Sequence, residues 1–200
     1  PLEGMAFFDL NQNGGKVNFQ LHFSPICIDD KYGYDAYDLY DYPRVDGFTI
    51  LPTLLHPKSR GTVSLSSSDP KDAPIIQPNF LEEKEDLDQL VKGGELVYKL
   101  MKDEALRKHT LRDRLPFDRN SQDSLIKHIK KTLETVYHPV GTCKMGVDSM
   151  AVVDPMLKVH GISNLRVVDA SIMPLIVSGN TNAPVYMIAE KASDMILNNF

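Results

Sequence analysis

The chain has 200 residues, of which 42% are hydrophobic and 24% charged, as is ordinary for a globular protein with a sizeable core. Its formal net charge of −5 and the lack of any Lys/Arg cluster argue against a nucleic acid partner. No apolar run approaches the roughly 20 residues that a membrane-spanning helix needs. The spacing of Cys27 and Cys143 indicates neither a disulfide framework nor a metal site. The cysteines therefore do not indicate whether the protein resides in an oxidising or a reducing compartment.

The N-terminal 43 residues combine strand signals with an acidic, aromatic stretch. Apolar segments within 1–28, around a turn at Asn13-Gly14-Gly15, predict strands of a hairpin. Residues 29–43 hold five Asp and five of the eight Tyr. We interpret them as a solvated loop whose rings cover apolar surface, with a lid or partner surface as the alternative. The chain opens at Pro1 without a methionine or a leader, from which we expect the interior of a longer protein.

Three further segments are typical of strands. Residues 45–55 and 61–68 are predicted strands, separated by a turn around Pro57–Gly61. Residues 165–171, LRVVDAS, predict a short and nearly continuous apolar strand that ends in small polar residues.

Three helices are predicted, over 82–101, from about Ser121 to Val136, and over about 183–197. Ser121 is an expected N-cap of the second, and Gly93-Gly94 lowers helix propensity in the middle of the first. The inward face of the last helix is predicted to consist of Val185, Ile188, Ala189, Ala192 and Ile196.

In YHPVGTCKMG, residues 137–146, a histidine directly precedes a proline, so its backbone has little conformational freedom. Pro139 pushes His138 out of the α region, so the preceding helix is expected to end there. His138 would then lie just past a helix C-terminus, whose negative end favours the imidazolium formed when a base takes a proton. A single His-Pro is nevertheless more often structural than catalytic, so the motif is weak evidence when taken alone.

Two other chemistries are conceivable for this stretch. Cys143 could act as a thiol nucleophile with His138 as its base, but nothing near it indicates a helix N-terminus or a basic pocket. A zinc site would need three or four convergent ligands, and His138, Cys143 and His160 offer no closely spaced pair, so no metal is expected.

Three segments together resemble one enzyme family. The 137–146 motif, SNLRVVDASIMP at 163–174 and SGNTNAPVYMIAEKASDMI at 178–196 are similar to the C-terminal portion of the glucose–methanol–choline (GMC) oxidoreductases, in the same order and spacing. The resemblance covers roughly 44–197, with a particular likeness to insect glucose dehydrogenase-like and bacterial choline dehydrogenase-like members. Residues 1–43 match only loosely.

The resemblance implies a flavoenzyme that oxidises a CH–OH group to a carbonyl by hydride transfer to FAD. It places the family's catalytic histidine on His138 and the second catalytic position, His or Asn in different members, on Asn180. The chemistry agrees with these residue types, because hydride leaves more readily once a base removes the hydroxyl proton. Asn180 cannot take that proton, but it can donate a hydrogen bond to the alkoxide-like oxygen.

The resemblance also implies cofactor contacts. It places Asp169, Ala170 and Ser171 in a turn that approaches the cofactor. Thr181 and Asn182, at the start of the last helix, are implied to contact the pyrimidine edge of the flavin. Reduced flavin carries negative charge near N1 and O2, which a helix N-terminus stabilises.

One departure from the family pattern bears on the domain organisation. The G-x-G-x-x-G turn that holds the FAD pyrophosphate does not occur in this sequence. We therefore expect an α+β fold: a loosely matched segment at 1–43, a substrate-binding domain with a sheet and helices on one face at 44–162, and a returning strand and helix of the FAD-binding α/β domain at 163–200.

The sequence leaves several alternatives open. The substrate is expected to be a small-molecule alcohol, such as a sugar, choline, a sterol or an aryl alcohol, and the electron acceptor oxygen, a quinone or another molecule. A secreted or extracellular location is implied only by resemblance. A relative that keeps the fold as a non-catalytic binding or structural module is the rival interpretation, and a cysteine-dependent hydrolase is a third.

Overall fold

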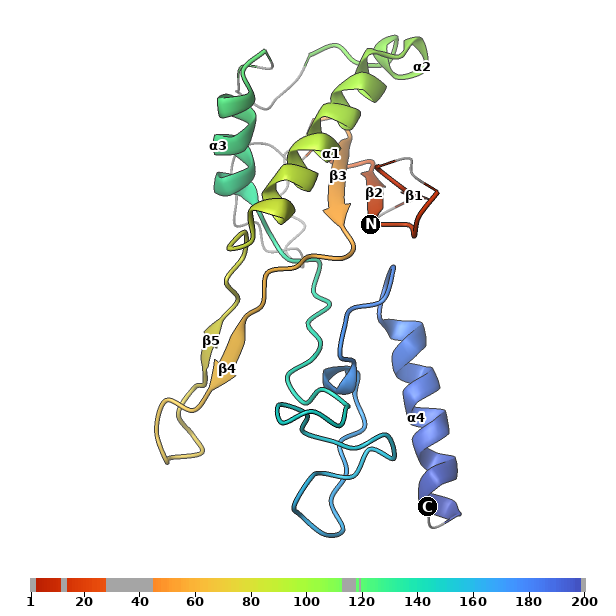
Figure 1. The fold of residues 1–200 in the computed structure, drawn as a ribbon. Coiled ribbons are helices and arrows are strands. Elements are labelled where there is room, and N and C mark those ends of the chain that lie inside the picture. The colour runs from red at the N-terminus through yellow and green to blue at the C-terminus, as the bar shows by residue number, and fades with distance from the viewer. Residues whose placement is uncertain (1–2, 12–13, 28–44, 113–117, 119, 199–200) are drawn as a thin grey trace. The chain divides into compact units, whose positions relative to one another are not determined.

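The computed structural model describes residues 3–11, 14–27, 45–112, 118 and 120–198 (Figure 1). The chain divides into two compact units, the first made of 1–59 with 81–134 and the second of 60–80 with 135–200. The predicted Tyr- and Asp-rich loop at 29–43 lies outside the described residues. The predicted limits 1–43, 44–162 and 163–200 refer to roles within the family, and they stay a prediction.

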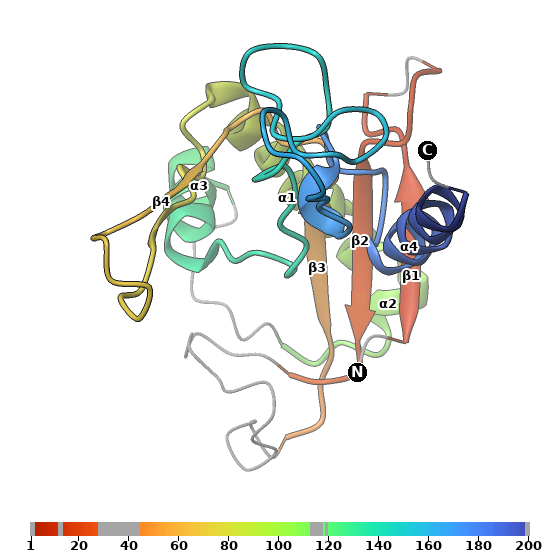
Figure 2. The same cartoon turned by 90° about the horizontal axis from the view of Figure 1, so that it is seen from below.

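The first unit contains a three-stranded antiparallel sheet in the order β1-β2-β3 (Figure 2). Its strands are β1 (Gly4–Phe8), β2 (Phe19–Ser24) and β3 (Thr49–Leu54). The predicted pairing of the two N-terminal strands is confirmed. Pro52, which lacks an amide hydrogen, is tolerated in β3 because this strand ends the order β1-β2-β3 and, among the described residues, pairs with β2 alone.

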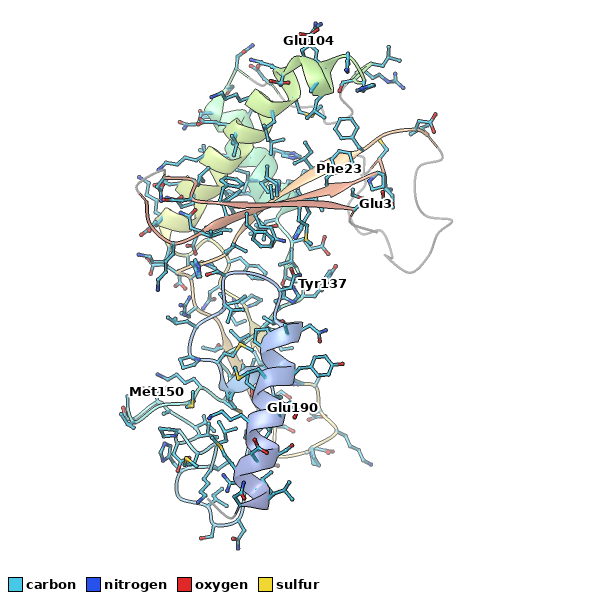
Figure 3. All side chains as sticks on the ribbon, turned by 90° about the vertical axis from the view of Figure 1, so that its right-hand side faces the viewer. Glu3, Phe23, Glu104, Tyr137, Met150 and Glu190 are labelled. Carbon is cyan, nitrogen blue, oxygen red and sulfur yellow. The ribbon has the colours of Figure 1, made fainter. Side chains whose placement is uncertain are left out.

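Helix α1 (Lys84–Lys102) packs on this sheet at Gly93. A Cβ added at Gly93 would lie 2.1 Å from Cζ of Phe19, a β2 residue with no exposed surface. The lower helix propensity of glycine is therefore offset by a close approach that no larger residue permits. Helices α1 and α3 lie on one face of the sheet, as expected for the α+β class (Figure 3). A short helix, α2 (Glu104–Arg107), was not predicted.

Helix α3 (Gln122–Thr132) begins as predicted, because the Ser121 hydroxyl accepts a hydrogen bond from the Ser124 amide at 3.3 Å. It ends earlier than the predicted Val136. The hydroxyl of Thr135 accepts a hydrogen bond from the Tyr137 amide at 3.1 Å, which offers the backbone an alternative to the helix. β-Branched Thr135 and Val136 also have a low helix propensity.

The second unit contains a two-stranded hairpin and a core built around α4 (Asn182–Leu197). Strand β4 (Thr62–Ser64) is shorter than the predicted 61–68, and its partner β5 (Ile75–Gln77) was not predicted. The core consists of Val153, Leu157, Ile172, Met173, Ile188, Ala192 and Met195. The predicted inward face of α4 is thus correct at Ile188 and Ala192 and wrong at Ala189 and Ile196, which are exposed.

The predicted strand at 165–171 is not a regular strand within the described residues. Its backbone pairing is confined to an isolated bridge between Lys158 and Arg166. The segment then turns into a short 3-10 helix, Ala170–Ile172, which lies beside α4 (Figure 1). An extended segment becomes a regular strand only when a neighbouring strand supplies its hydrogen bonds along its length. At this bridge the Val159 amide donates to the Leu165 carbonyl at 2.9 Å and the Val167 amide donates to the Leu157 carbonyl at 3.2 Å.

Candidate active site

The imidazole of His138 lies between the side chains of Asn180 and Thr181. Its Nε2 atom is 3.0 Å from Nδ2 of Asn180, a residue 42 positions further along the chain. Its Nδ1 atom is 3.1 Å from Oγ1 of Thr181. The two residues predicted to be catalytic, His138 and Asn180, are therefore in direct contact.

These contacts favour one position for the hydrogen of the neutral ring. The amide nitrogen of Asn180 is a donor only, so Nε2 of His138 accepts its hydrogen bond and carries no hydrogen. Nδ1 is then the protonated nitrogen of the neutral ring, and it donates to the Thr181 hydroxyl. With the amide of Asn180 in this orientation, Nε2 is the unprotonated nitrogen of the imidazole, and its lone pair accepts the Asn180 hydrogen.

The backbone around His138 differs from the predicted helix end. Helix α3 stops at Thr132, so no helix C-terminus lies at His138, and the expected support of an imidazolium by the helix dipole is wrong. Instead, Tyr137 adopts a left-handed conformation with φ of 62°, close to the N-terminal end of α4 (Figure 3). Such a conformation is unfavourable for a tyrosine, and Pro139 adds a fixed φ on the other side.

The loop after His138 is held by the turn predicted to approach the cofactor. The Cys143 amide donates to the Ser171 carbonyl at 3.0 Å, and the Met145 amide donates to the Ile172 carbonyl at 2.8 Å. Gly141 has a φ of 90°, which favours glycine. The histidine motif and the Asp-Ala-Ser turn thus form one hydrogen-bonded assembly.

Each residue of the Asp-Ala-Ser turn has a local structural role as well. An Asp169 carboxylate oxygen accepts hydrogen bonds from the Ser171 amide at 2.8 Å and from the Ser171 hydroxyl. This arrangement caps the 3-10 helix that begins at Ala170. Asp169 is exposed, whereas Ala170 and Ser171 are half-buried.

Asn180 and Thr181 are placed by the turn that leads into α4. Gly179 precedes them with a φ of 155°, and Thr181 is the N-cap residue of the helix. The Thr181 side chain, which is 8% exposed, makes no capping hydrogen bond. Asn182 follows as an exposed residue in the first turn. The contact between Thr181 and His138 was not predicted; the adjacency of Thr181 to Asn180 was the only sequence signal for it.

The described part of the chain also bears on a metal site, a thiol site and a membrane span. No group of three or more His, Cys, Asp or Glu residues there could hold a metal ion. Both Cys27 and Cys143 are free, and Cys143 is half-buried. None of the helices described is long and apolar enough to cross a membrane.

Comparisons with known sequences agree on one family. A family model described as GMC oxidoreductase matches residues 57–189. The chain is 40% identical over 196 residues to an alcohol dehydrogenase [acceptor] of Pseudomonas putida, covering 98% of this chain and 34% of that protein. It is 39% identical over 180 residues to an oxygen-dependent choline dehydrogenase of Pseudomonas savastanoi pv. phaseolicola, covering 90% of this chain and 30% of that protein. The first alignment extends into 1–43, beyond the predicted range of 44–197.

The chain also superimposes on solved structures of oxidases. Pyridoxine 4-oxidase from Mesorbium loti superimposes with a TM-score of 0.85 at 29% identity, covering 97% of this chain and 37% of that one. A variant of formate oxidase from Aspergillus oryzae RIB40, studied for its FAD modification, superimposes with a TM-score of 0.79 at 29% identity, covering 93% of this chain and 32% of that one. The chain thus spans about a third of the length of the curated relatives that it matches.

Proposed function

Because the chain belongs to the GMC oxidoreductase family, we propose that it forms the C-terminal part of an FAD-dependent enzyme that oxidises an alcohol CH–OH group to a carbonyl. The names of its relatives, an alcohol dehydrogenase and a choline dehydrogenase, support a small-molecule alcohol as the substrate. FAD, when bound, supplies the acceptor for the hydride. Oxygen, a quinone or another molecule would then take the electrons.

The contact between His138 and Asn180 is the observation that carries this proposal. An alcohol oxygen that enters between the two side chains would replace their direct contact: it would donate its hydrogen to Nε2 of His138 and accept one from Nδ2 of Asn180. His138 would remove the hydroxyl proton, because Nε2 is the unprotonated nitrogen of its ring. Asn180 would stabilise the negative charge that develops on the oxygen, since its amide donates without titrating.

The residues around α4 fit a flavin at its N-terminus. The Thr181 side chain does not cap the helix, so it leaves the amides of the first turn to other acceptors. These amides would stabilise negative charge on the pyrimidine edge of the flavin, with Asn182 as the exposed side chain beside it. We assign Asp169, Ala170, Ser171, Thr181 and Asn182 to this contact region.

The proposal is tested by His138→Ala in the full-length enzyme loaded with FAD. The rate of flavin reduction by an oxidisable alcohol should fall by roughly 10²–10⁴-fold, the usual contribution of a general base, while FAD stays bound. His160→Ala is a matched control, because His160 is exposed and its Nε2 lies near the Gly146 carbonyl rather than near Asn180. A loss of less than threefold in His138→Ala would contradict the assignment, and the rival non-catalytic role predicts no flavin reduction by any alcohol.

A further inference from the structure

The Thr181 hydroxyl lies where it can determine the hydrogen position on His138. A neutral imidazole carries its single hydrogen on either nitrogen, and the partner of one nitrogen decides which form prevails. Nδ1 of His138 lies 3.1 Å from Oγ1 of Thr181, and Nε2 lies 3.0 Å from Nδ2 of Asn180. The Thr181 hydroxyl can accept the Nδ1 hydrogen or donate to an unprotonated Nδ1. A hydrogen on Nε2 would face the donor group of Asn180, so the two contacts together favour the form in which Thr181 accepts.

The helix start supports a specific role for this hydroxyl. A threonine at an N-cap normally adopts an extended backbone and accepts a hydrogen bond from the first turn. Thr181 has φ of −87° and ψ of −8° instead, and its side chain caps nothing. Its hydroxyl, within a residue that is 8% exposed, contacts His138.

From this geometry we infer that Thr181 is a positioning residue, which holds the hydrogen of His138 on Nδ1 and so keeps the lone pair of Nε2 free to take a proton. The inference rests on the proposed function for its catalytic consequence, but the hydrogen position is a property of the protein alone. Thr181 acts through His138 and does not itself exchange a proton with the substrate.

Two substitutions separate the hydroxyl from the shape of the side chain. Thr181→Val keeps the branched shape and removes the acceptor, whereas Thr181→Ser keeps the hydroxyl and removes a methyl group. In the full-length, FAD-loaded enzyme, Thr181→Val should lower the limiting rate of flavin reduction roughly 5- to 50-fold, as expected when a buried donor loses its partner. The substrate dissociation constant should change less than twofold, the rate should be compared per bound FAD, and Thr181→Ser should restore most of the rate.

A second measurement reports the hydrogen position without any turnover. The 15N chemical shifts of the imidazole of His138, assigned by comparison with His138→Gln, distinguish a protonated from an unprotonated nitrogen. We expect a protonated Nδ1 in the wild-type enzyme and in Thr181→Ser, and a mixture of both forms in Thr181→Val. If the valine variant fails to retain FAD, Thr181→Ala replaces it with the same two measurements.

Each failure has its own signature. A wild-type spectrum with the hydrogen on Nε2 would overturn the inference, as would a Thr181→Val variant with unchanged spectrum and rate, or a serine variant as slow as the valine one. A His138→Ala variant that keeps its rate would refute the proposed function alone, because the spectra would still report whether Thr181 sets the hydrogen position.

Discussion

Gly93 in α1 lies directly against the ring of Phe19 in β2: a Cβ on this glycine would lie 2.1 Å from Cζ. Phe19 has no exposed surface, so its ring has no free space into which to move. We therefore expect Gly93→Ala to destabilise the folded protein by roughly 2 kcal/mol or more, because overpacking outweighs the gain in helix propensity of about 1 kcal/mol. Chemical denaturation of both proteins would measure the difference in unfolding free energy.

Gly94→Ala provides the comparison for this prediction. A Cβ there would lie 3.1 Å from Cδ1 of Leu125, the end of a flexible side chain that can shift by a few tenths of an ångström. The change in unfolding free energy should stay within about 1 kcal/mol, since the gain in helix propensity offsets the contact. Equal destabilisation by the two substitutions would contradict the close approach of α1 to Phe19.

The glycine pair also illustrates what the sequence could and could not predict about the fold. The period of apolar residues located α1, and the Ser121 signal located the start of α3, because both depend on residues close in sequence. The same reasoning predicted that Gly93-Gly94 would weaken the helix, because helix propensity depends on the residue type alone. The packing of α1 against β2 depends on residues far away in the sequence, which propensity does not include. Strand β5 was missed for a similar reason: an exposed three-residue segment carries little periodic signal.

Replacing Asn180 tests whether its amide acts as a hydrogen-bond donor. Asn180→Asp should reduce flavin more slowly than Asn180→His in the full-length enzyme. An aspartate can only accept at pH 7, so it would favour a hydrogen on Nε2 of His138 and place negative charge beside the forming alkoxide. A histidine can still donate. Stopped-flow measurement of flavin reduction distinguishes the two, and equal rates would argue against a donor role.

The site was predicted only in part, and the reasons are physical. The pairing of His138 with Asn180 followed from the family resemblance, since residues 42 apart carry no local signal of contact. The predicted helix end at His138 was wrong because the hydroxyl of Thr135 captures the Tyr137 amide. The direction of the Thr181 side chain depends on one φ and ψ pair at the start of α4, which composition and periodicity do not determine.

Cys143 is expected to be structural rather than nucleophilic. Its backbone amide, not its thiol, makes the contact with the Ser171 carbonyl, and that contact survives replacement of the side chain. Cys143→Ser should therefore retain most of the turnover of the full-length enzyme, and thiol alkylation should not abolish activity. Complete inactivation with normal FAD content would instead support the alternative of a thiol nucleophile with His138 as its base.

His128 in α3 should make stability depend on pH. Partial burial, together with the positive charge of nearby Lys131, lowers the pKa of His128 below its ordinary value of 6.5. The unfolded chain therefore binds the proton more readily, and the contribution of this group to stability is lost as pH falls through 6.5 toward the lower folded pKa. Melting temperatures at several pH values should fall less steeply in His128→Gln than in the wild type.

The last prediction concerns the cofactor affinity of these 200 residues when they are produced alone. The backbone amides that hold the FAD pyrophosphate in this family come from a G-x-G-x-x-G turn, which the sequence does not contain. The residues assigned to the cofactor, from Asp169 to Ser171 and at the start of α4, would contact only the ring end of FAD. We therefore expect no tight FAD binding and no dehydrogenase activity. Absorbance at the flavin bands after gel filtration would measure the FAD that stays bound.

The same polypeptide should also associate, because large apolar side chains of α4 and of the β4–β5 hairpin are exposed. Tyr186 is 68% exposed, Met187 57% and Ile76 63%. Exposed apolar patches and short unpaired strand edges promote association. Replacing Met187 and Ile76 by glutamate should reduce aggregation, as followed by light scattering, without creating FAD affinity. A yellow, soluble and monomeric preparation of the unaltered 200 residues would show that the cofactor's affinity lies within this part of the protein.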